Sequence, residues 1–119
     1  MSSKDIGDQA ESLAQTHLEN AGLIVVEQNY RSRRGEIDLI MLDNKILVFV
    51  EVRFRKSARF GSALESIDHR KQSRIIHTAQ YYLQQLTTDY SGYRFDVVAI
   101  SSTMNTADIV WIKDAFQMT

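Results

Sequence analysis

The spacing of hydrophobic residues changes along the chain, and each change predicts a different kind of element. From Lys4 to Ala21, apolar residues recur every three or four positions, which is typical of an amphipathic helix. Gly22 follows where a left-handed C-terminal cap belongs. The helical spacing returns from about Ile67 to Leu86. The pattern therefore predicts two helices, one at the start of the chain and one in its second half.

The remaining apolar segments are short and are typical of β-strands. They lie at Leu23–Val26, Glu36–Leu42, Lys45–Arg55, Tyr93–Ile100 and Ile109–Ile112. Asp43 and Asn44 supply a two-residue turn, so we expect the strands on either side of it to form a hairpin. A polar stretch, Ser101–Asp108, separates the last two strands. The order αβββαββ predicts one α/β domain over residues 1–119, with a mixed β-sheet flanked by helices.

The composition excludes several classes of protein. The 119 residues are 44% hydrophobic and 24% charged, which suits one domain with a modest core. Cysteine is absent, which excludes disulfides, thiolate zinc sites and a cysteine nucleophile. The longest apolar run, Ile46–Val50, is far shorter than the ~20 residues of a membrane span. The first dozen residues lack the apolar segment of a secretory signal, so we expect a cytoplasmic protein with no membrane partner.

Basic residues are concentrated in the segment from Tyr30 to His77. Eleven of the fourteen Lys and Arg residues lie there but only six of the fifteen acids, so this segment carries +5 and the rest of the chain −6. The basic residues form three clusters: Arg31, Arg33 and Arg34; Arg53, Arg55, Lys56 and Arg59; and Arg70, Lys71 and Arg74. Any single cluster can be an ordinary solvated surface. Three clusters in one segment favour a polyanionic partner such as nucleic acid.

Acidic residues interrupt the two strands of the predicted hairpin. Because side chains alternate along a strand, Glu36 and Asp38 share one face, with Ile37 and Leu39 on the other. On the partner strand, Glu51 directly follows the apolar run. The two-residue turn places Glu36 opposite Glu51, whereas a register shifted by two residues places Asp38 opposite Glu51. Both registers bring the three acids to one face.

Carboxylates gathered in this way destabilise a sheet unless positive charge lies between them. Arginine, for example Arg53, can supply that charge in a structural ion-pair network. A divalent cation is the other candidate, because Mg²⁺ and similar ions bind one or two protein carboxylates together with substrate phosphates. Such an ion beside basic residues is a recurring arrangement for phosphodiester cleavage.

Two segments, Gly35–Ile40 (GEIDLI) and Val48–Arg53 (VFVEVR), resemble the PD-(D/E)xK nuclease signature. Over nearly its whole length the chain is similar to the YraN family of small bacterial proteins, which is grouped with archaeal Holliday-junction resolvases. This similarity includes Asn29–Arg31, Phe60–Gly61, Lys71–Gln72 and Arg94–Val98. The resemblance implies a restriction endonuclease-like core in which Asp38 and Glu51 bind Mg²⁺ or Mn²⁺. It also implies that Glu11, on the first helix, completes the ligand set.

One position departs from the nuclease signature. Its third polar residue is usually lysine and here is Arg53, which cannot act as a general base because a guanidinium stays protonated. Arg53 can still bind a phosphate or stabilise charge in the transition state. Some members of the superfamily carry the lysine on a neighbouring helix, and Lys71 is the candidate here. Lys71 and Gln72 lie near the start of the second helix, at or within its apolar stripe.

We therefore expect a divalent-metal-dependent, endonuclease-like phosphodiesterase that acts on DNA or RNA, with DNA favoured as the partner. Its expected catalytic residues are Asp38, Glu51, Arg53, Lys71 and Gln72, and its expected metal ligands are Glu11, Asp38 and Glu51. The residues expected to bind nucleic acid are Arg31, Arg33, Arg34, Arg55, Lys56 and Arg59. One alternative is a catalytically inactive nucleic-acid-binding module with a nuclease fold. Another is a structural or interaction protein in which the acids pair with arginines. Whatever the function, a second copy of the chain is a candidate partner, which would form a homodimer.

Overall fold

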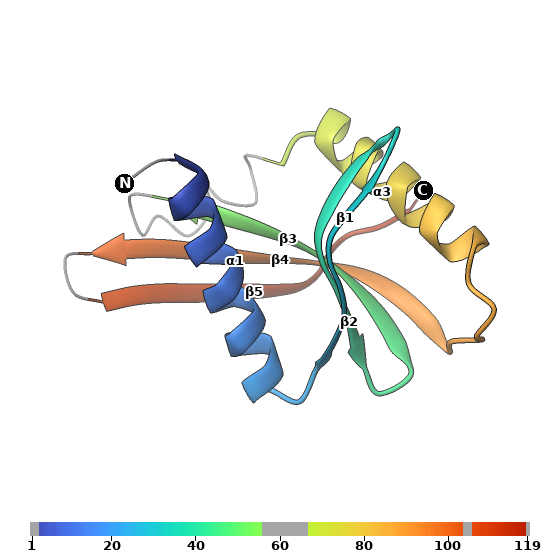
Figure 1. Cartoon of the computed structure of the whole chain (residues 1–119), viewed down its shortest axis with the longest axis horizontal. Helices are drawn as coiled ribbons and strands as arrows, with labels where there is room; N and C mark the ends of the chain where they lie inside the picture. The colour runs from blue at the N-terminus through green and yellow to red at the C-terminus, as the bar shows by residue number, and fades with distance from the viewer. Residues whose placement is uncertain (1–2, 56–66, 104–105, 119) are drawn as a thin grey trace.

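The computed structural model describes residues 3–55, 67–103 and 106–118 and contains two helices and five strands in these ranges. In chain order the elements are α1 (Ser3–Asn20), β1 (Ile24–Ser32), β2 (Gly35–Asp43), β3 (Ile46–Arg55), α3 (His69–Gln84), β4 (Gly92–Thr103) and β5 (Thr106–Phe116). This order confirms the predicted αβββαββ arrangement (Figure 1). Neither described helix is long and apolar enough to cross a membrane.

The five strands form one mixed sheet in the order β1-β2-β3-β4-β5. Strands β3 and β4 pair in parallel, and the other neighbours pair antiparallel. A parallel pair needs a long crossover connection, and the chain between β3 and β4, which includes α3, supplies it. The two helices pack on opposite faces of the sheet, so the sheet forms the middle layer (Figure 1).

Strand alternation divides the hydrophobic core into two clusters. On β3, Leu47 and Phe49 pack towards α3, while Val48 and Val50 pack towards α1. All four side chains are at most 1% exposed, as expected for a central strand covered on both faces. The uninterrupted apolar run on β3 thus supplies side chains to both halves of the core.

Two strands are longer than their apolar patterns predict. The first was predicted to end at Val26, but β1 continues to Ser32 because its backbone pairs with β2 along this length. Most of the predicted separator Ser101–Asp108 belongs to the β4–β5 hairpin, whose residues pair from Ser101 with Asp108 to Thr103 with Thr106. Backbone hydrogen bonds form these ladders whatever the side chains are, so polar strands at a sheet edge lack the expected alternation.

The turn between β2 and β3 lies one residue later than predicted. Asp43 pairs with Ile46, and Asn44 and Lys45 form the turn. Asn44 has φ 55°, in the left-handed region that asparagine tolerates better than most residues. This turn produces the alternative register, the one that places Asp38 opposite Glu51. The last pair of the β2–β3 ladder, Leu39 with Val50, lies directly next to these two acids.

Strands β2 and β3 separate after the pair formed by Leu39 and Val50. Beyond that pair β3 continues along β4, while β2 follows β1 towards α3 (Figure 1). The prediction that Ile37 and Leu39 share a face is therefore wrong, because Ile37 packs in the cluster beneath α3 and Leu39 in the cluster beneath α1. At Gly35, with φ 152°, an added Cβ would lie 3.2 Å from the hydroxyl of Thr78, so the hairpin and α3 approach closely there.

A fully buried acid, Asp96, connects the strands at the β4–β5 edge of the sheet. Asp96 on β4 accepts hydrogen bonds from Arg94 Nε at 3.0 Å, from the indole of Trp111 at 2.9 Å and from the backbone N–H of Asp114 at 2.9 Å. The β4–β5 register shifts beside Asp96, and its carboxylate bonds the backbone of the bulge. Arg94 also lies 3.0 Å from Asp43 at the end of β2, which ties three strands together.

We predict that Asp96→Ala lowers the free energy of unfolding by about 3 kcal/mol or more. The change leaves the Arg94 guanidinium and the Trp111 indole without their buried acceptor. Urea denaturation measures the loss. Asp108→Ala, at an exposed acid on β5, is the control and should change stability by less than about 0.5 kcal/mol. Equal losses in the two variants would contradict this role of Asp96.

Candidate functional site

The two predicted metal ligands meet where β2 separates from β3. Because Leu39 pairs with Val50, Asp38 and Glu51 come next on the two strands, and their carboxyl groups share a hydrogen bond. Asp38 Oδ2 also accepts a hydrogen bond of 2.8 Å from the backbone N–H of Val52. Because the strands separate here, the backbone N–H of Val52 is not paired with the backbone of β2. The carboxyl group of Asp38 accepts its hydrogen bond instead.

This contact changes the protonation of Asp38. Burial, the hydrogen bond to Glu51 and the negative charge of Glu51 raise the pKa of Asp38 from 3.8 to about 9, although the N–H of Val52 acts in the opposite direction. Glu51 itself is only 6% exposed. At neutral pH Asp38 therefore keeps its proton and acts as the donor between the two carboxyl groups. Burial and the charge of Glu51 thus dominate the protonation of Asp38.

The nearest cation comes from α3. Lys71 Nζ lies 2.9 Å from Glu51 Oε2, whereas the guanidinium of Arg53 lies 4.0 Å from the same oxygen. Asp68 is the N-cap of α3 and accepts a hydrogen bond of 2.9 Å from the backbone N–H of Lys71, which fixes the first turn of the helix. The structure thus brings together the two acids and the helix lysine that we considered as the replacement for the signature lysine.

Gln72, the next predicted residue, makes a different contact. Its side-chain amide donates a hydrogen bond of 2.9 Å to the carbonyl oxygen of Ile67, just before the helix. Ile67 is 2% exposed and belongs to the core cluster beneath α3. Gln72 therefore anchors the start of α3, and with it the backbone position of Lys71.

Glu11 reaches the same region from α1. Partial burial raises the pKa of Glu11, and the negative charges of Asp8, Glu36 and Glu51 raise it further, while Arg31 lowers it. A pocket of about 300 Å³ lies between α1 and the hairpin. It is lined by Asp8, Glu11, Ser12, Gln15, Gln28, Asn29, Asp38 and Leu39. Within residues 3–55, 67–103 and 106–118, however, no three Asp, Glu or His side chains are assembled into a metal-binding group.

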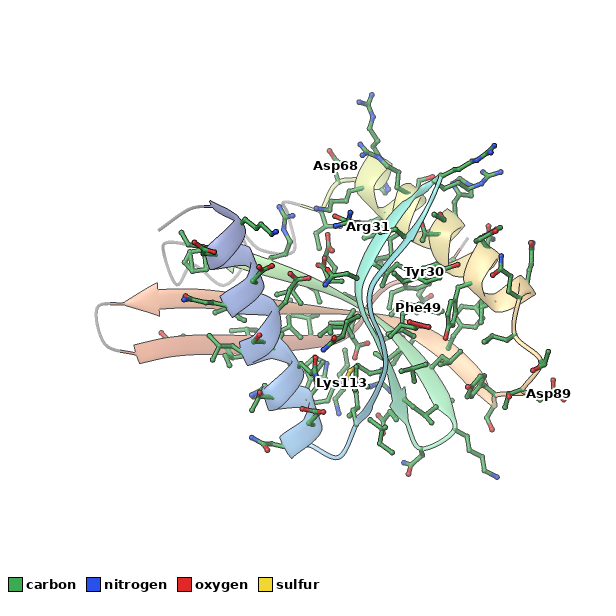
Figure 2. All side chains as sticks on the ribbon, viewed as in Figure 1. Tyr30, Arg31, Phe49, Asp68, Asp89 and Lys113 are labelled. Atoms are coloured by element: carbon green, nitrogen blue, oxygen red, sulfur yellow. The ribbon has the colours of Figure 1, made fainter. Side chains whose placement is uncertain are left out.

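The predicted nucleic-acid-binding residues are distributed over two regions. Arg31, Arg33 and Arg34 are exposed at the end of the β1–β2 hairpin, and Arg31 forms an ion pair of 3.2 Å with Glu36. Figure 2 shows Arg31 on the same side of the molecule as Asp68, at the start of α3. Arg55 is the last residue of β3. Lys56 and Arg59, also expected to bind nucleic acid, and Phe60 and Gly61 of the family resemblance lie outside the described residues.

Sequence patterns gave little sign of the amide side chains in this pocket. Gln15 and Gln28 are polar residues on a helix and an edge strand, where such residues usually face solvent. Asn29 has φ 50°, so its backbone adopts the left-handed conformation beside the pocket. In the sequence, only the similarity to the YraN family, which includes Asn29, drew attention to this residue.

Comparison with known proteins gives one consistent result. A model of the uncharacterised protein family UPF0102 matches residues 10–100. The chain is 47% identical over 116 residues to a UPF0102 protein of Nitrosococcus oceani, covering 97% of this chain and 94% of that protein. It is 46% identical over 118 residues to a UPF0102 protein of Pseudomonas savastanoi, covering 97% and 95% of the two chains. A UPF0102 protein of Colwellia psychrerythraea is 44% identical over 117 residues, covering 97% and 91%.

We predict that Asp38→Asn stabilises the protein in the absence of metal, by more than about 2 kcal/mol near pH 8 and by much less near pH 4. The pKa of Asp38 is higher in the folded protein than in the unfolded chain, so the wild type loses stability as the pH rises from about 4 towards about 9. Asparagine keeps an acceptor for Val52 and a donor for Glu51 but does not ionise.

Urea denaturation in EDTA at several pH values measures this difference. The control is Asp108→Asn, at an exposed acid, whose effect should not change with pH. If Asp38 belongs to a structural ion-pair network instead, Asp38→Asn will destabilise the protein near pH 8.

Proposed function

The chain belongs to the uncharacterised protein family UPF0102, and we propose that it is a divalent-metal-dependent phosphodiesterase that cleaves nucleic acid. The family match confirms the YraN-like resemblance, and the kinship of that family with nucleases is part of the proposal. One observation carries it. Asp38 and Glu51 hold their carboxyl groups together where β2 leaves β3, with the ammonium group of Lys71 2.9 Å from Glu51.

The residues present fit a hard divalent cation. Carboxylate oxygens are the ligands that Mg²⁺ and Mn²⁺ prefer, and one or two protein carboxylates with substrate phosphates commonly suffice. The raised pKa of Asp38 supports this proposal, because a cation between the two carboxyl groups would relieve their repulsion. Asp38 and Glu51 would hold the ion, and Glu11, which lines a pocket together with Asp38, would assist. When bound, the ion stabilises the negative charge that develops on the phosphate.

Lys71 and Arg53 have separate roles in this proposal. Lys71 pairs with Glu51 in the metal-free protein, and its flexible side chain can turn to a phosphate oxygen of the substrate. Arg53, further from Glu51, stays protonated and can bind two phosphate oxygens at once, so it orients substrate and stabilises charge. Gln72 acts as a positioning residue, because its bond to Ile67 holds the turn that carries Lys71.

The substrate we propose is DNA rather than RNA, following the resemblance to resolvases. Three exposed arginines, Arg31, Arg33 and Arg34, lie at the end of the β1–β2 hairpin, and Arg31 lines a cavity together with Glu11 and Asp38. Arginine clusters bind the nucleic-acid backbone whatever the base sequence. They would therefore hold the strand while the carboxylate site acts on it.

A second candidate is a nucleic-acid-binding module of the same fold without catalysis. Arg53 in place of lysine favours it, as does the lack of an assembled three-ligand group among the described residues. A purely structural role would use only the ion pair between Lys71 and Glu51 and would require neither metal nor nucleic acid.

We predict that millimolar Mn²⁺ or Mg²⁺ raises the melting temperature by about 3–6 °C, because an ion that binds only the folded carboxylate pair stabilises the protein by mass action. Differential scanning fluorimetry measures the shift. Asp38→Ala should abolish it, and Asp89→Ala, at an exposed acid outside the site, should retain it. A melting temperature indifferent to metal, both alone and with DNA, would argue against metal binding.

Cleavage of labelled linear and branched DNA with Mn²⁺ tests catalysis. We expect Lys71→Ala to slow cleavage by about 10²- to 10³-fold, since it removes a charge-stabilising donor, and Arg53→Lys to leave it similar or moderately lower. Asp38→Ala should show only background and serves as the contamination control. If the wild type is inactive and Arg53→Lys cleaves, the inactive-module candidate is correct. Equal cleavage by every preparation would reveal a contaminant.

A further inference from the structure

A second pocket lies on the α3 side of the β1–β2 hairpin, and the proposed chemistry does not use it. It has a volume of about 410 Å³ and is lined by Arg31, Ser32, Arg33 and Arg34 from the hairpin and by Tyr81 from α3. None of these five residues is acidic. The pocket is large enough for a small planar ligand.

Tyr81 is the unusual residue in this pocket. It lies on the outward face of α3 and is 45% exposed, although a tyrosine of the core would bury its ring. The next residue, Tyr82, is buried and packs edge-to-face on Tyr30, with ring centroids 4.9 Å apart. Tyr81 is also close enough to Tyr30 to contribute to the raised pKa of Tyr30. The ring of Tyr81 is therefore partly exposed beside the packed pair of Tyr30 and Tyr82, which leaves it available to a ligand.

The same pocket is strongly cationic. Three arginines lie within four consecutive residues at the end of the hairpin, and only Arg31 is paired with an acid there, Glu36 at 3.2 Å, in the part of the chain that the structure describes. An aromatic face surrounded by guanidinium groups is the combination that binds single-stranded nucleic acid. A base stacks on the ring, and the cations bind the flanking phosphates.

Arg31 connects this pocket with the carboxylate site. It lines the Tyr81 pocket and also the cavity shared by Glu11, Glu36 and Asp38. Figure 2 shows Arg31 and Tyr30 on the stretch of β1 that runs beside α3. A strand whose phosphate binds Arg31 can therefore place one neighbouring nucleotide by Tyr81 and another by the carboxylates.

We propose that the Tyr81 pocket binds one unpaired nucleobase, stacked on Tyr81, with its flanking phosphates on Arg31, Arg33 and Arg34. The preferred substrate would then carry unpaired nucleotides beside the cleavage position. A fully paired duplex offers these arginines its phosphates but keeps its bases stacked within the helix, so it cannot fill the pocket. This inference rests on the proposed function, because it assigns the substrate class of that site.

Binding measured in EDTA separates this inference from cleavage. Fluorescence anisotropy compares a labelled oligothymidylate of about 12 nucleotides with a duplex of the same length. Tyr81→Ala should weaken binding of the single strand by about 5- to 140-fold and leave duplex binding unchanged. Tyr81→Phe should bind like the wild type, and Tyr81→Leu, without a π-face, should behave like Tyr81→Ala. Gln84→Ala, exposed one turn further along α3, is the matched control and should have no effect.

A single strand carrying 2-aminopurine adds a direct readout, because stacking on a ring quenches its fluorescence. Quenching by wild type and by Tyr81→Phe, but not by Tyr81→Leu, is the expected result. Equal binding by wild type and Tyr81→Ala, or parallel losses on both probes, would overturn the stacking pocket while leaving the phosphodiesterase proposal standing. If the wild type binds neither probe and cleaves no DNA, the inference and the proposed function fail together.

Discussion

The contact between Asp38 and Glu51 is the constraint on which the site depends. Two carboxyl groups buried side by side cannot both ionise at low cost, so one of them keeps a proton or a cation enters between them. In the metal-free protein, Asp38 remains protonated, and Lys71 compensates the charge of Glu51. Protonation of Asp38, the proposed metal binding and the position of Lys71 on α3 would thereby be coupled, because each alters the charge at the same two groups.

The fold creates this contact by separating two strands. Strand β3 stays in the sheet through its parallel pairing with β4, while β2 leaves with β1 to pack on α3. Hydrophobic clusters on both faces of β3 hold it in place, and the close approach at Gly35 holds the hairpin against the helix. On the far side, the buried carboxylate of Asp96 ties β4 to β5. The unfavourable contact is thus supported by favourable packing around it.

The hairpin formed by β1 and β2 also organises the charge of the molecule. Its acidic side, with Glu36 and Asp38, faces α1, and its end carries Arg31, Arg33 and Arg34 next to α3. The basic stretch that begins at Arg31 therefore lies between two pockets of different chemistry. One holds carboxylates suited to a cation, and the other holds guanidinium groups around an aromatic ring suited to a nucleotide.

The sequence by itself determined the order and type of the elements and the apolar centre of β3. It also determined that Asp38 and Glu51 fall on neighbouring strands. These features depend on periodicity and turn residues, which are local. It left open the register, since both registers put the acids on one face, and it left open whether Lys71 or Arg53 serves Glu51. It also assigned Ile37 to the wrong face, and it gave no sign of the pocket that Tyr81 forms with the hairpin. Only the tertiary structure decided these points, because they depend on where β2 leaves β3 and on how α3 packs against the hairpin, contacts between residues far apart in the chain.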